Sequence, residues 1–432
     1  MGAFVGKLEQ LNSRPWLACP EQQAEFNAAF AAATEALKEK AGPVVICEVD
    51  RVHLLAAVFA AMLEARPVFL TSPAWGAHEW AQAEAQIPNA ANVLKTSENT
   101  TAKRMFTGEM NAPEAGAVLV PTGGTGGRIK FAVHTAETLL ASVRGYQSYW
   151  GGTVLNAVCP LPACHIGGLM LALRTALTGG RLWLCDARLE EAAPVGFDLA
   201  SAHCSVVGAQ LRRVLDQGRH WLTDCGAVLV GGGPSTGELV NDALAAGISI
   251  YTAYGLTEAA ATVALSKVEP GSDPFAGEVL PHWRLEITDG QIQLSGEALF
   301  QGYWGEAPRA GEFWSTDDRG ALADGRLKVL GRAGRFVITG GRKVDANLLE
   351  QRLLAWPEIR DVIALGVPDR QWGEALTVVA VASCDSVALA DKARAELVPE
   401  MRPKNWYLMD EAPRTAHGKP DWARVYYLIN KT

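Results

Sequence analysis

Residues 121–130 read PTGGTGGRIK and directly follow the apolar run at residues 117–120. Four glycines leave many backbone N–H groups free to point into one concavity, two threonines add hydroxyls, and Arg128 and Lys130 add positive charge. Such a loop is typical of a polyphosphate cradle. The spacing excludes the P-loop pattern GxxxxGK[ST] and the dinucleotide pattern GxGxxG. A flexible surface turn is the alternative interpretation.

The chain around this loop alternates strand-like and helix-like segments, which predicts a parallel α/β layer. The first unit has a strand at residues 43–47, a helix at 51–64 and a strand at 68–70. Further strands are expected at residues 117–120, 154–159, 181–185, 205–207, 227–230 and 248–252.

The pattern changes after about residue 275, where the strand-like runs become shorter and look antiparallel. These runs lie at residues 283–288, 291–295 and 326–329, with hairpin signals at Asp289-Gly290 and Asp324-Gly325. After Gly331 a small α+β unit is expected, with helices at residues 347–356 and 388–397 and strands at 361–367 and 375–382.

Length and composition narrow the class of protein. A chain of 432 residues predicts two or three domains. It is 49% apolar and 20% charged, which indicates a folded protein, and its net charge of −8 argues against a nucleic-acid partner. The absence of a long apolar stretch predicts no transmembrane segment and a cytoplasmic protein. The eight cysteines form no CxxC pair and are interpreted as core residues.

The glycine loop resembles the phosphate loop of the adenylate-forming acyl-CoA synthetases, the AMP-binding superfamily, which usually reads Thr-Ser-Gly-Ser/Thr-Thr-Gly-x-Pro-Lys. The pattern is kept at Thr122, Gly124, Gly127 and Lys130 and is lost at Gly123, Gly126 and Ile129. Four further motifs follow in the family's order, and the resemblance covers roughly residues 30–425.

Residues 254–258 read YGLTE, the second of these motifs. The resemblance implies that Tyr254 stacks on adenine, Thr257 bonds the phosphate and Glu258 holds Mg²⁺, for which a carboxylate is a suitable ligand. The alternative is an ordinary strand-to-helix turn capped by Thr257.

The later motifs supply the ribose, hinge and lysine positions. Asp318 falls where the family accepts both ribose hydroxyls, and Arg332 also reaches the ribose in relatives. Gly334 stands at the hinge, and Gly341 lies near the path of the pantetheine arm of coenzyme A. Lys419 corresponds to the catalytic lysine, which bridges the substrate carboxylate and the α-phosphate.

Together these motifs imply ATP, Mg²⁺ and coenzyme A as cofactor and co-substrates. The expected catalytic residues are Lys419, Glu258 and Thr257. The expected ATP-binding residues are Thr122, Gly123, Gly124, Thr125, Gly126, Gly127, Lys130, Gly232, Gly233, Tyr254, Gly255, Asp318 and Arg332.

Two segments, 131–135 (FAVHT) and 161–170 (LPACHIGGLM), resemble the 2-succinylbenzoate–CoA ligases of menaquinone and phylloquinone biosynthesis. The implied substrate is an aryl keto-dicarboxylic acid, with His165, Arg174, Ser205 and Thr262 at the acyl site. Arg174 lies in an otherwise apolar stretch, where a bound carboxylate would compensate its charge. A structural ion pair with a nearby acid is the alternative, and other acyl- and aryl-CoA ligases share every nucleotide motif.

The predicted fold is α/β. A large N-terminal domain, residues 1–333, combines parallel-sheet αβα lobes with a small antiparallel β lobe. A small mobile α+β domain, residues 334–432, carries the catalytic lysine. The partners are expected to be small molecules, and a homodimer is left open.

Two functions of other classes compete with this prediction. Residues 233–237 read GPSTG and fit the GxSxG elbow of α/β-hydrolases, with Ser235 followed by Asp318 and His417 in the required order. Pro234 next to the nucleophile and the separate placement of His417 argue against a hydrolase. A non-catalytic nucleotide-binding module is disfavoured by Glu258 and Lys419.

Overall fold

The computed structural model describes residues 2–12, 14–94, 106–109, 111–123, 129–218, 221–232, 237–273, 276–332, 335–339, 342–369, 371–415 and 418–431. The chain forms two compact units. The first comprises Met1–Glu286, Gln293–Trp314 and Ala323–Leu327, and the second Ile287–Ile292, Ser315–Leu322 and Lys328–Thr432. The boundary predicted at residues 333 and 334 stays a prediction.

The first sheet of the first unit has the order β3-β1-β2-β4-β5. Its strands are β1 (Val44–Ile46), β2 (Val68–Leu70), β3 (Asn92–Val93), β4 (Val118–Gly123) and β5 (Ile129–His134). The first four are parallel, whereas β5 is antiparallel to β4. The glycine loop therefore connects two antiparallel neighbours, so β5 is a strand that the sequence pattern did not predict.

Helices around this sheet supply most of its core. The helices are α1 (Gly2–Glu9), α2 (Pro20–Glu39), α3 (Arg51–Leu63) and α4 (Ala77–Glu84). Asp50 caps α3 by accepting from the backbone N–H groups of Val52 and His53, and α3 then packs against α2. The helix predicted at residues 51–64 and the strands on either side of it are confirmed.

The second sheet contains five parallel strands in the order β10-β9-β8-β6-β7. They are β6 (Asn156–Cys159), β7 (Leu182–Leu184), β8 (Ala202–Val206), β9 (Ala227–Val230) and β10 (Ile250–Leu256). Two antiparallel strands, β11 (Ala261–Lys267) and β12 (Ala276–Val279), continue it beyond β10.

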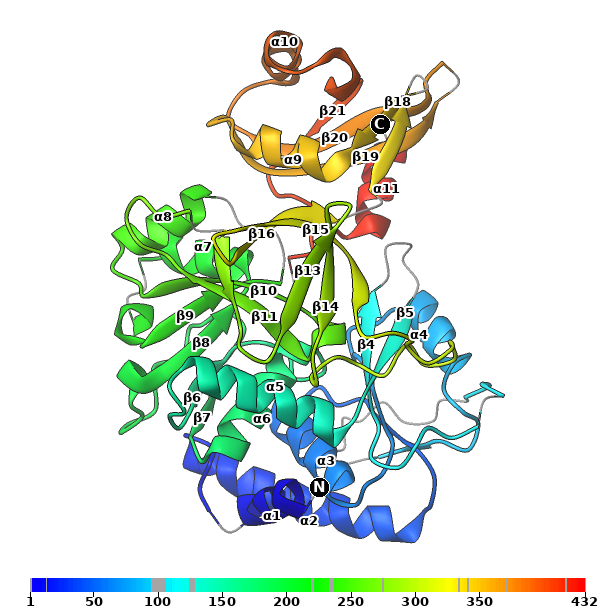
Figure 1. Ribbon diagram of the computed structural model, residues 1–432, viewed down its shortest axis with the longest axis vertical. Coiled ribbons are helices and arrows are strands. Elements are labelled where there is room, and N and C mark those ends of the chain that lie inside the picture. Colours follow the sequence, from blue (N-terminus) through cyan, green and yellow to red (C-terminus); the bar gives the residue numbers. More distant parts are fainter. Residues whose placement is uncertain are drawn as a thin grey trace. The chain divides into compact units, whose positions relative to one another are not determined.

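Helix α5 (Ala136–Tyr149) leads from the first sheet to the second, and α6 (Ile166–Thr178), α7 (Gly208–Asp216) and α8 (Gly237–Ala245) connect strands of the second sheet. Figure 1 shows α5 and α6 side by side in front of the sheet. α6 is buried along most of its length, as expected for a continuous apolar stretch, and Arg174 is its one charged side chain.

Short antiparallel strands follow in the sequence: β13 (Arg284–Thr288), β14 (Gln291–Ser295), β15 (Trp314–Ala323) and β16 (Arg326–Arg332). Both residues of each predicted turn have positive φ, 52° and 77° at Asp289-Gly290 and 51° and 73° at Asp324-Gly325. This is the signature of type I′ hairpins, so both hairpin predictions are confirmed.

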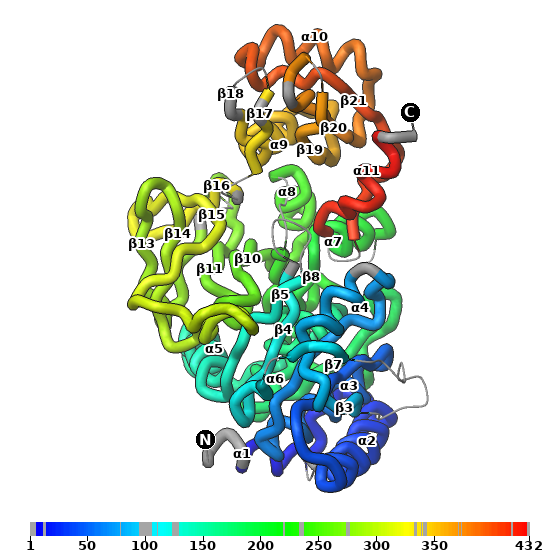
Figure 2. Tube along the Cα trace, turned by 90° about the vertical axis from the view of Figure 1, so that its right-hand side faces the viewer, coloured from blue at the N-terminus to red at the C-terminus, as the bar shows by residue number. Residues whose placement is uncertain are grey.

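The second unit has its own sheet, with the order β18-β17-β20-β19 and with β21 parallel to β20 (Figure 2). The strands are β17 (Phe336–Thr339), β18 (Arg342–Asp345), β19 (Ile359–Asp369), β20 (Gly373–Ala382) and β21 (Asn405–Leu408). The helices are α9 (Ala346–Leu354), α10 (Ser386–Glu396) and α11 (Trp422–Lys431). The α+β prediction for this segment is confirmed.

No helix within the described ranges combines the length and the apolar character that a membrane span requires. The predicted α/β fold class, with its parallel-sheet lobes and smaller C-terminal unit, is confirmed.

Candidate active site

The YGLTE motif lies at the junction of β10 and β11. A short 3₁₀ helix, η4 (Thr257–Ala259), joins the two strands, and the side chain of Thr257 caps no α-helix there. The alternative of a strand-to-helix turn is therefore wrong. Ala260 and Ala261 have φ angles of 45° and 83°. Positive φ is unfavourable for alanine, so the surrounding contacts must hold this turn in place.

Position 255 requires a glycine because the backbone at Ala261 passes directly against it. A β-carbon at this position would lie 1.9 Å from the carbonyl oxygen of Ala261. The pairing register between β10 and β11 also shifts between Tyr254 and Gly255. The glycine therefore lets the strand after η4 pass directly against the strand before it, with Tyr254 half-buried on β10.

Glu258 is buried at 6% exposure and is fixed from two directions. The hydroxyl of Tyr303 donates to its Oε1 at 2.8 Å, and the backbone N–H of Phe300 donates to its carbonyl oxygen at 2.9 Å. Its Oε2 has no hydrogen-bond partner among the described residues. An oriented carboxylate with one available oxygen fits Mg²⁺, which takes one or two carboxylates together with ligand phosphates.

Thr122 and Lys130 face each other across the β4–β5 pair, at the base of the glycine loop. The Lys130 ammonium lies 2.8 Å from Glu306 and 4.4 Å from the centre of the Tyr303 ring. Lys130 and Glu258 therefore share Tyr303 as a neighbour. Gly123 ends β4, while Gly124, Thr125, Gly126 and Gly127 lie outside the described residues.

His134, at the end of β5, is a site residue to which the sequence analysis assigned no role. Its side chain is completely buried. Its Nε2 donates to the carbonyl oxygen of Thr257 at 2.8 Å, and its Nδ1 lies 3.0 Å from Thr138 Oγ1. Burial lowers the pKa of His134 to about 4, so the ring is neutral near pH 7. In the sequence, only its place in the FAVHT segment pointed to His134.

Arg174 and Thr262 are brought together, as the acyl-site prediction requires. Arg174 is 4% exposed, and its Nη2 donates to Thr262 Oγ1 at 3.1 Å. Its guanidinium carbon lies 3.8 Å from the centre of the Tyr146 ring, a cation–π contact. Within the described part of the chain Arg174 forms no ion pair, and its buried Nε has no hydrogen-bond partner. The alternative of a structural ion pair thus has no partner among these residues.

Aromatic rings and histidines surround Arg174, and sequence patterns did not single them out. Tyr146 hydrogen-bonds to His203 Nδ1 at 3.0 Å, and Trp283 Nε1 donates to the Thr262 carbonyl oxygen at 3.2 Å. Burial lowers the pKa of Arg174 to about 10, and burial together with the Arg174 charge lowers the pKa of His203 to about 4. The cluster therefore carries one positive charge, on Arg174, at neutral pH.

The other two predicted acyl residues lie near the ends of neighbouring elements. Ser205 is half-buried on β8. Among the hydrogen bonds of the described residues, none joins Ser205 to Arg174. His165 is half-buried at the N-cap of α6, where its backbone carbonyl oxygen accepts from the backbone N–H of Leu169 at 3.0 Å. The structure thus joins Arg174 to Thr262 directly, whereas Ser205 and His165 lie on β8 and at the start of α6.

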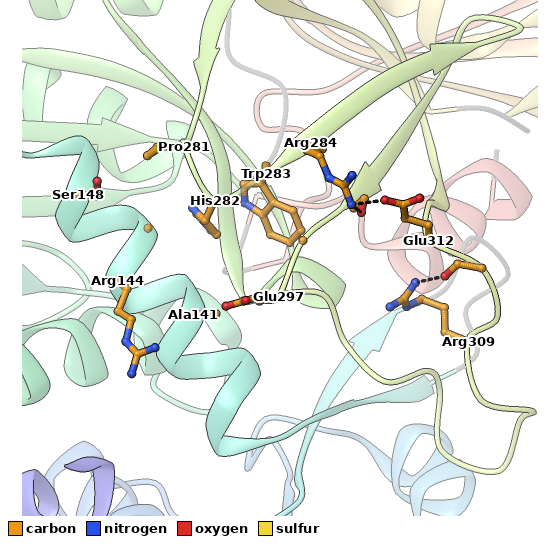
Figure 3. A pocket seen from close by; sticks show the side chains of 14 residues that line it. Ala141, Arg144, Ser148, Pro281, His282, Trp283, Arg284, Glu297, Arg309 and Glu312 are labelled. Carbon is orange, nitrogen blue, oxygen red and sulfur yellow. Dashed lines mark hydrogen bonds and ion pairs between the residues drawn. The ribbon is translucent and has the colours of Figure 1, made fainter.

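A cavity of about 740 Å³ lies between α5 and the segments that carry His282 and Glu312. Figure 3 shows Arg144 and Ser148 on the helix, with His282 and Trp283 across from it. The His282 ring occupies the space where a β-carbon on Gly145 would lie, 1.8 Å from its Nδ1. None of the residues predicted for the site lines this cavity.

The remaining predicted residues belong to the second unit. Asp318 is half-buried on β15, and its backbone N–H donates to Thr316 Oγ1 at 3.0 Å. Arg332 ends β16. Lys419 is exposed, and its carbonyl oxygen accepts from the Thr415 N–H at 2.7 Å. Arg414 anchors the same loop by donating to Asp361 at 2.7 Å and to the Gly418 carbonyl at 3.0 Å.

Several predicted positions are not described by the structure. Gly232 is exposed with a φ of 78°, but its neighbour Gly233 lies outside the described residues. Also outside the described residues are the hinge position Gly334, Gly341 near the expected pantetheine path, and Ser235 and His417 of the hydrolase alternative.

Comparison with known proteins identifies two family matches. Residues 28–304, more than half of the chain, match the AMP-binding enzyme family. Residues 348–419 match the AMP-binding enzyme C-terminal domain. The two matches follow each other in the order that the sequence motifs predict.

Individual relatives agree with the family matches. A 2-succinylbenzoate–CoA ligase of Salmonella typhimurium is 31% identical over 296 residues, which cover 67% of this chain and 63% of that protein. The structure of an E. coli MenE variant with bound OSB-AMS superposes with a TM-score of 0.76 at 23% identity, covering 94% and 92% of the two chains. The Bacillus subtilis O-succinylbenzoate coenzyme A synthetase (MenE), in complex with ATP and magnesium, superposes at 0.73 and 21% identity, covering 92% of each chain.

Proposed function

The chain belongs to the AMP-binding enzyme family, and from this premise we propose that it ligates 2-succinylbenzoate to coenzyme A through an acyl-adenylate. The observation that carries the substrate assignment is Arg174, a buried cation beside the Thr262 hydroxyl with no acidic partner among the described residues. A benzoate carboxylate supplies the missing charge. The Salmonella typhimurium relative with this activity supports the proposal.

The first step joins the acid to the nucleotide. A carboxylate oxygen of the succinyl arm attacks the α-phosphorus of ATP, the bond to the β-phosphate oxygen breaks, and pyrophosphate leaves. Lys130 and the backbone of the glycine loop hold the leaving phosphates, and Thr257 donates to the phosphate. Lys419 stabilises the negative charge that develops between the carboxylate and the α-phosphate.

Glu258 is the carboxylate that would hold Mg²⁺ in this step. When bound there, the ion would supply positive charge that offsets the charge of the phosphates. Glu258 is suited to this role because Tyr303 fixes its Oε1 at 2.8 Å and the Phe300 backbone fixes its carbonyl. On the nucleotide, Tyr254, Gly232, Gly233 and Gly255 line the adenine, while Asp318 and Arg332 bind the ribose.

The second step transfers the acyl group to sulfur. The thiol of coenzyme A attacks the acyl carbon, the bond to the AMP phosphate oxygen breaks, and a proton is lost from the thiol. Thioester and AMP are the products. We assign the change between the two steps to rotation of the C-terminal segment about Gly334, with Gly341 beside the pantetheine arm.

A pyrophosphate-release assay tests the proposal directly. Purified protein is given ATP, Mg²⁺ and one of 2-succinylbenzoate, benzoate, succinate or octanoate, with and without coenzyme A. The largest kcat/KM is expected for 2-succinylbenzoate, with AMP and a thioester of matching mass appearing only when coenzyme A is added. A larger kcat/KM for a monocarboxylic acid would instead assign the chain to another acyl- or aryl-CoA ligase activity.

A cytoplasmic location and a homodimer remain part of the proposal. The substrates ATP and coenzyme A are cytoplasmic metabolites, which favours that compartment. Light scattering of the purified protein gives the oligomeric state, with 46.1 kDa expected for a monomer and twice that mass for the dimer.

A further inference from the structure

The turn that carries Thr257 and Glu258 is held by a frame that starts at the glycine loop. β5 begins at Ile129, directly after the loop, and ends at His134. One edge of β5 binds the segment that carries Tyr303, through Gln301 N–H to the Val133 carbonyl at 2.8 Å and Val133 N–H to the Gly302 carbonyl at 3.0 Å. Tyr303 then donates to Glu258.

The end of β5 reaches the same turn by a second route. His134 Nε2 lies 2.8 Å from the carbonyl oxygen of Thr257. A carbonyl oxygen can only accept, so the proton of the neutral ring must be on Nε2. Nδ1 is then an acceptor for the Thr138 hydroxyl at 3.0 Å, and Thr138 is itself held by the Thr135 N–H at 3.0 Å. The Thr257 carbonyl oxygen therefore selects the Nε2–H tautomer, and the capping-box residue Thr138, whose hydroxyl also lies 3.0 Å from the Thr135 carbonyl oxygen, contacts the other ring nitrogen.

The far side of the turn is held from the same helix. Ser142 Oγ donates to the Ala260 carbonyl oxygen at 2.7 Å. Ala260 is completely buried and adopts a φ of 45°. A strained conformation of this kind persists only where neighbouring groups over-determine it, and His134 and Ser142 bind its two ends.

We propose that His134 is a positioning residue for adenylation: through the Thr257 carbonyl it holds the Thr257–Glu258 turn in register with the glycine loop. This rests on the proposed function and deepens it. The proposed phosphate-binding loop and metal-binding carboxylate belong to two separate sheets, β4–β5 and β10–β11. His134 connects them with one side chain, so that the triphosphate and its Mg²⁺ meet groups already placed relative to each other.

Two substitutions test whether an N–H donor at the position of Nε2 is required or whether any polar side chain at residue 134 suffices. His134→Gln keeps an N–H donor at the position of Nε2, because its amide nitrogen is the same number of bonds from Cα. His134→Asn places its amide near Nδ1 and loses the bond to Thr257. His53→Gln and His53→Asn serve as matched controls, because His53 contacts Glu25 at 3.2 Å and lies outside the described network.

The first readout is the adenylation reaction. His134→Asn is expected to lower kcat for pyrophosphate release by about 10- to 100-fold with little change in the KM for the acid, whereas His134→Gln retains most of the activity. Equal losses in both variants, or a wild-type kcat in His134→Asn, would overturn the proposal. Absence of pyrophosphate release by the wild-type protein with every acid would refute the proposed function instead.

The second readout needs no turnover. Calorimetric titration with ATP is performed with and without Mg²⁺, and His134→Asn is expected to weaken the binding of MgATP while leaving that of metal-free ATP unchanged. ¹⁵N spectra of histidine-labelled wild-type protein are expected to show the His134 ring in the Nε2–H form at pH 6, identified as the signal that disappears in both His134 variants. A different tautomer, or equal weakening of both forms of ATP, would contradict the assignment.

Discussion

At the scale of single residues, the burial and charge of Arg174 carry the proposed substrate assignment. Its guanidinium contacts the Tyr146 ring and the Thr262 hydroxyl, yet finds no carboxylate among the described residues. A buried charge without a counter-charge is unfavourable, and a bound acid removes that penalty. We therefore expect Arg174 to lower the stability of the empty protein and to raise its affinity for a dicarboxylic substrate.

The enzyme kinetics of Arg174 variants test the expected contribution of this residue to substrate affinity. Arg174→Ala is expected to raise the KM for 2-succinylbenzoate by about 10- to 100-fold, the range for losing a charged hydrogen-bond partner, with the KM for ATP unchanged. Arg174→Lys keeps the charge but loses the planar fork, so an intermediate KM is expected. Unchanged kinetics for 2-succinylbenzoate in Arg174→Ala would remove this residue from the acyl site.

A further substitution of Arg174 tests whether its buried charge lowers the stability of the protein without substrate. Arg174→Met replaces the buried charge with an apolar side chain of similar length, and its midpoint of thermal unfolding is expected to equal or exceed that of the wild type. Differential scanning fluorimetry without substrate measures this. A clear fall in the midpoint would mean that Arg174 is structurally compensated.

At the scale of elements, the β10–η4–β11 turn depends on close backbone approach. Gly255→Ala would place a β-carbon 1.9 Å from the Ala261 carbonyl oxygen, so the strands must separate. A destabilisation of about 1–3 kcal/mol is expected, with loss of adenylation because Glu258 shifts. Gly237→Ala is the control, because a β-carbon there meets no atom within 4 Å.

Chemical denaturation with a parallel pyrophosphate assay compares the two glycine variants. Gly255→Ala should unfold at lower denaturant concentration and be inactive, while Gly237→Ala should resemble the wild type. If Gly255→Ala behaved like Gly237→Ala, the close approach at this turn would not be a constraint in solution.

At the scale of the whole molecule, three histidines of the first unit make stability depend on pH. Burial lowers the pKa values of His134, His203 and His282 to about 4, against 6.5 for an exposed ring. Between pH 6.5 and 4 the unfolded chain therefore binds more protons than the folded one, and the free energy of unfolding falls as the pH falls. The completely buried His134 alone lowers the free energy of unfolding by about 3 kcal/mol over this pH range.

Unfolding midpoints measured from pH 7 to pH 4 test this expectation. The contribution of these histidines is fully present above pH 6.5 and is lost as the pH falls through 4. His203→Gln should flatten the dependence, because it removes one of the three protonation sites. An unchanged slope in that variant would show that His203 is not buried as a neutral ring.

Also at this scale, Lys419 belongs to the second unit and Glu258 to the first. We expect Lys419→Ala to abolish acyl-adenylate formation while sparing thioester formation from pre-made adenylate, because the lysine acts only in the first step. The two half-reactions are assayed separately by pyrophosphate release and thioester formation. An equal loss in both would contradict domain rotation between the steps.

The sequence by itself determined those features whose signal is local. Apolar runs set the parallel strands, and Asp-Gly pairs set the two hairpins, because φ > 0 restricts which residues can occupy such turns. The ordered motifs likewise determined the family, because the residue types that cradle phosphate and bind Mg²⁺ stand together in short segments.

Only the tertiary structure decided which distant residues meet. Strand β5 was not predicted, because a short apolar segment after a glycine loop does not reveal that it pairs backward. Tyr303 reaches Glu258 across 45 residues and His134 reaches Thr257 across 123. Hydrogen bonds between residues so far apart leave no periodicity in the sequence, so the contacts that position Glu258 become visible only in the folded structure.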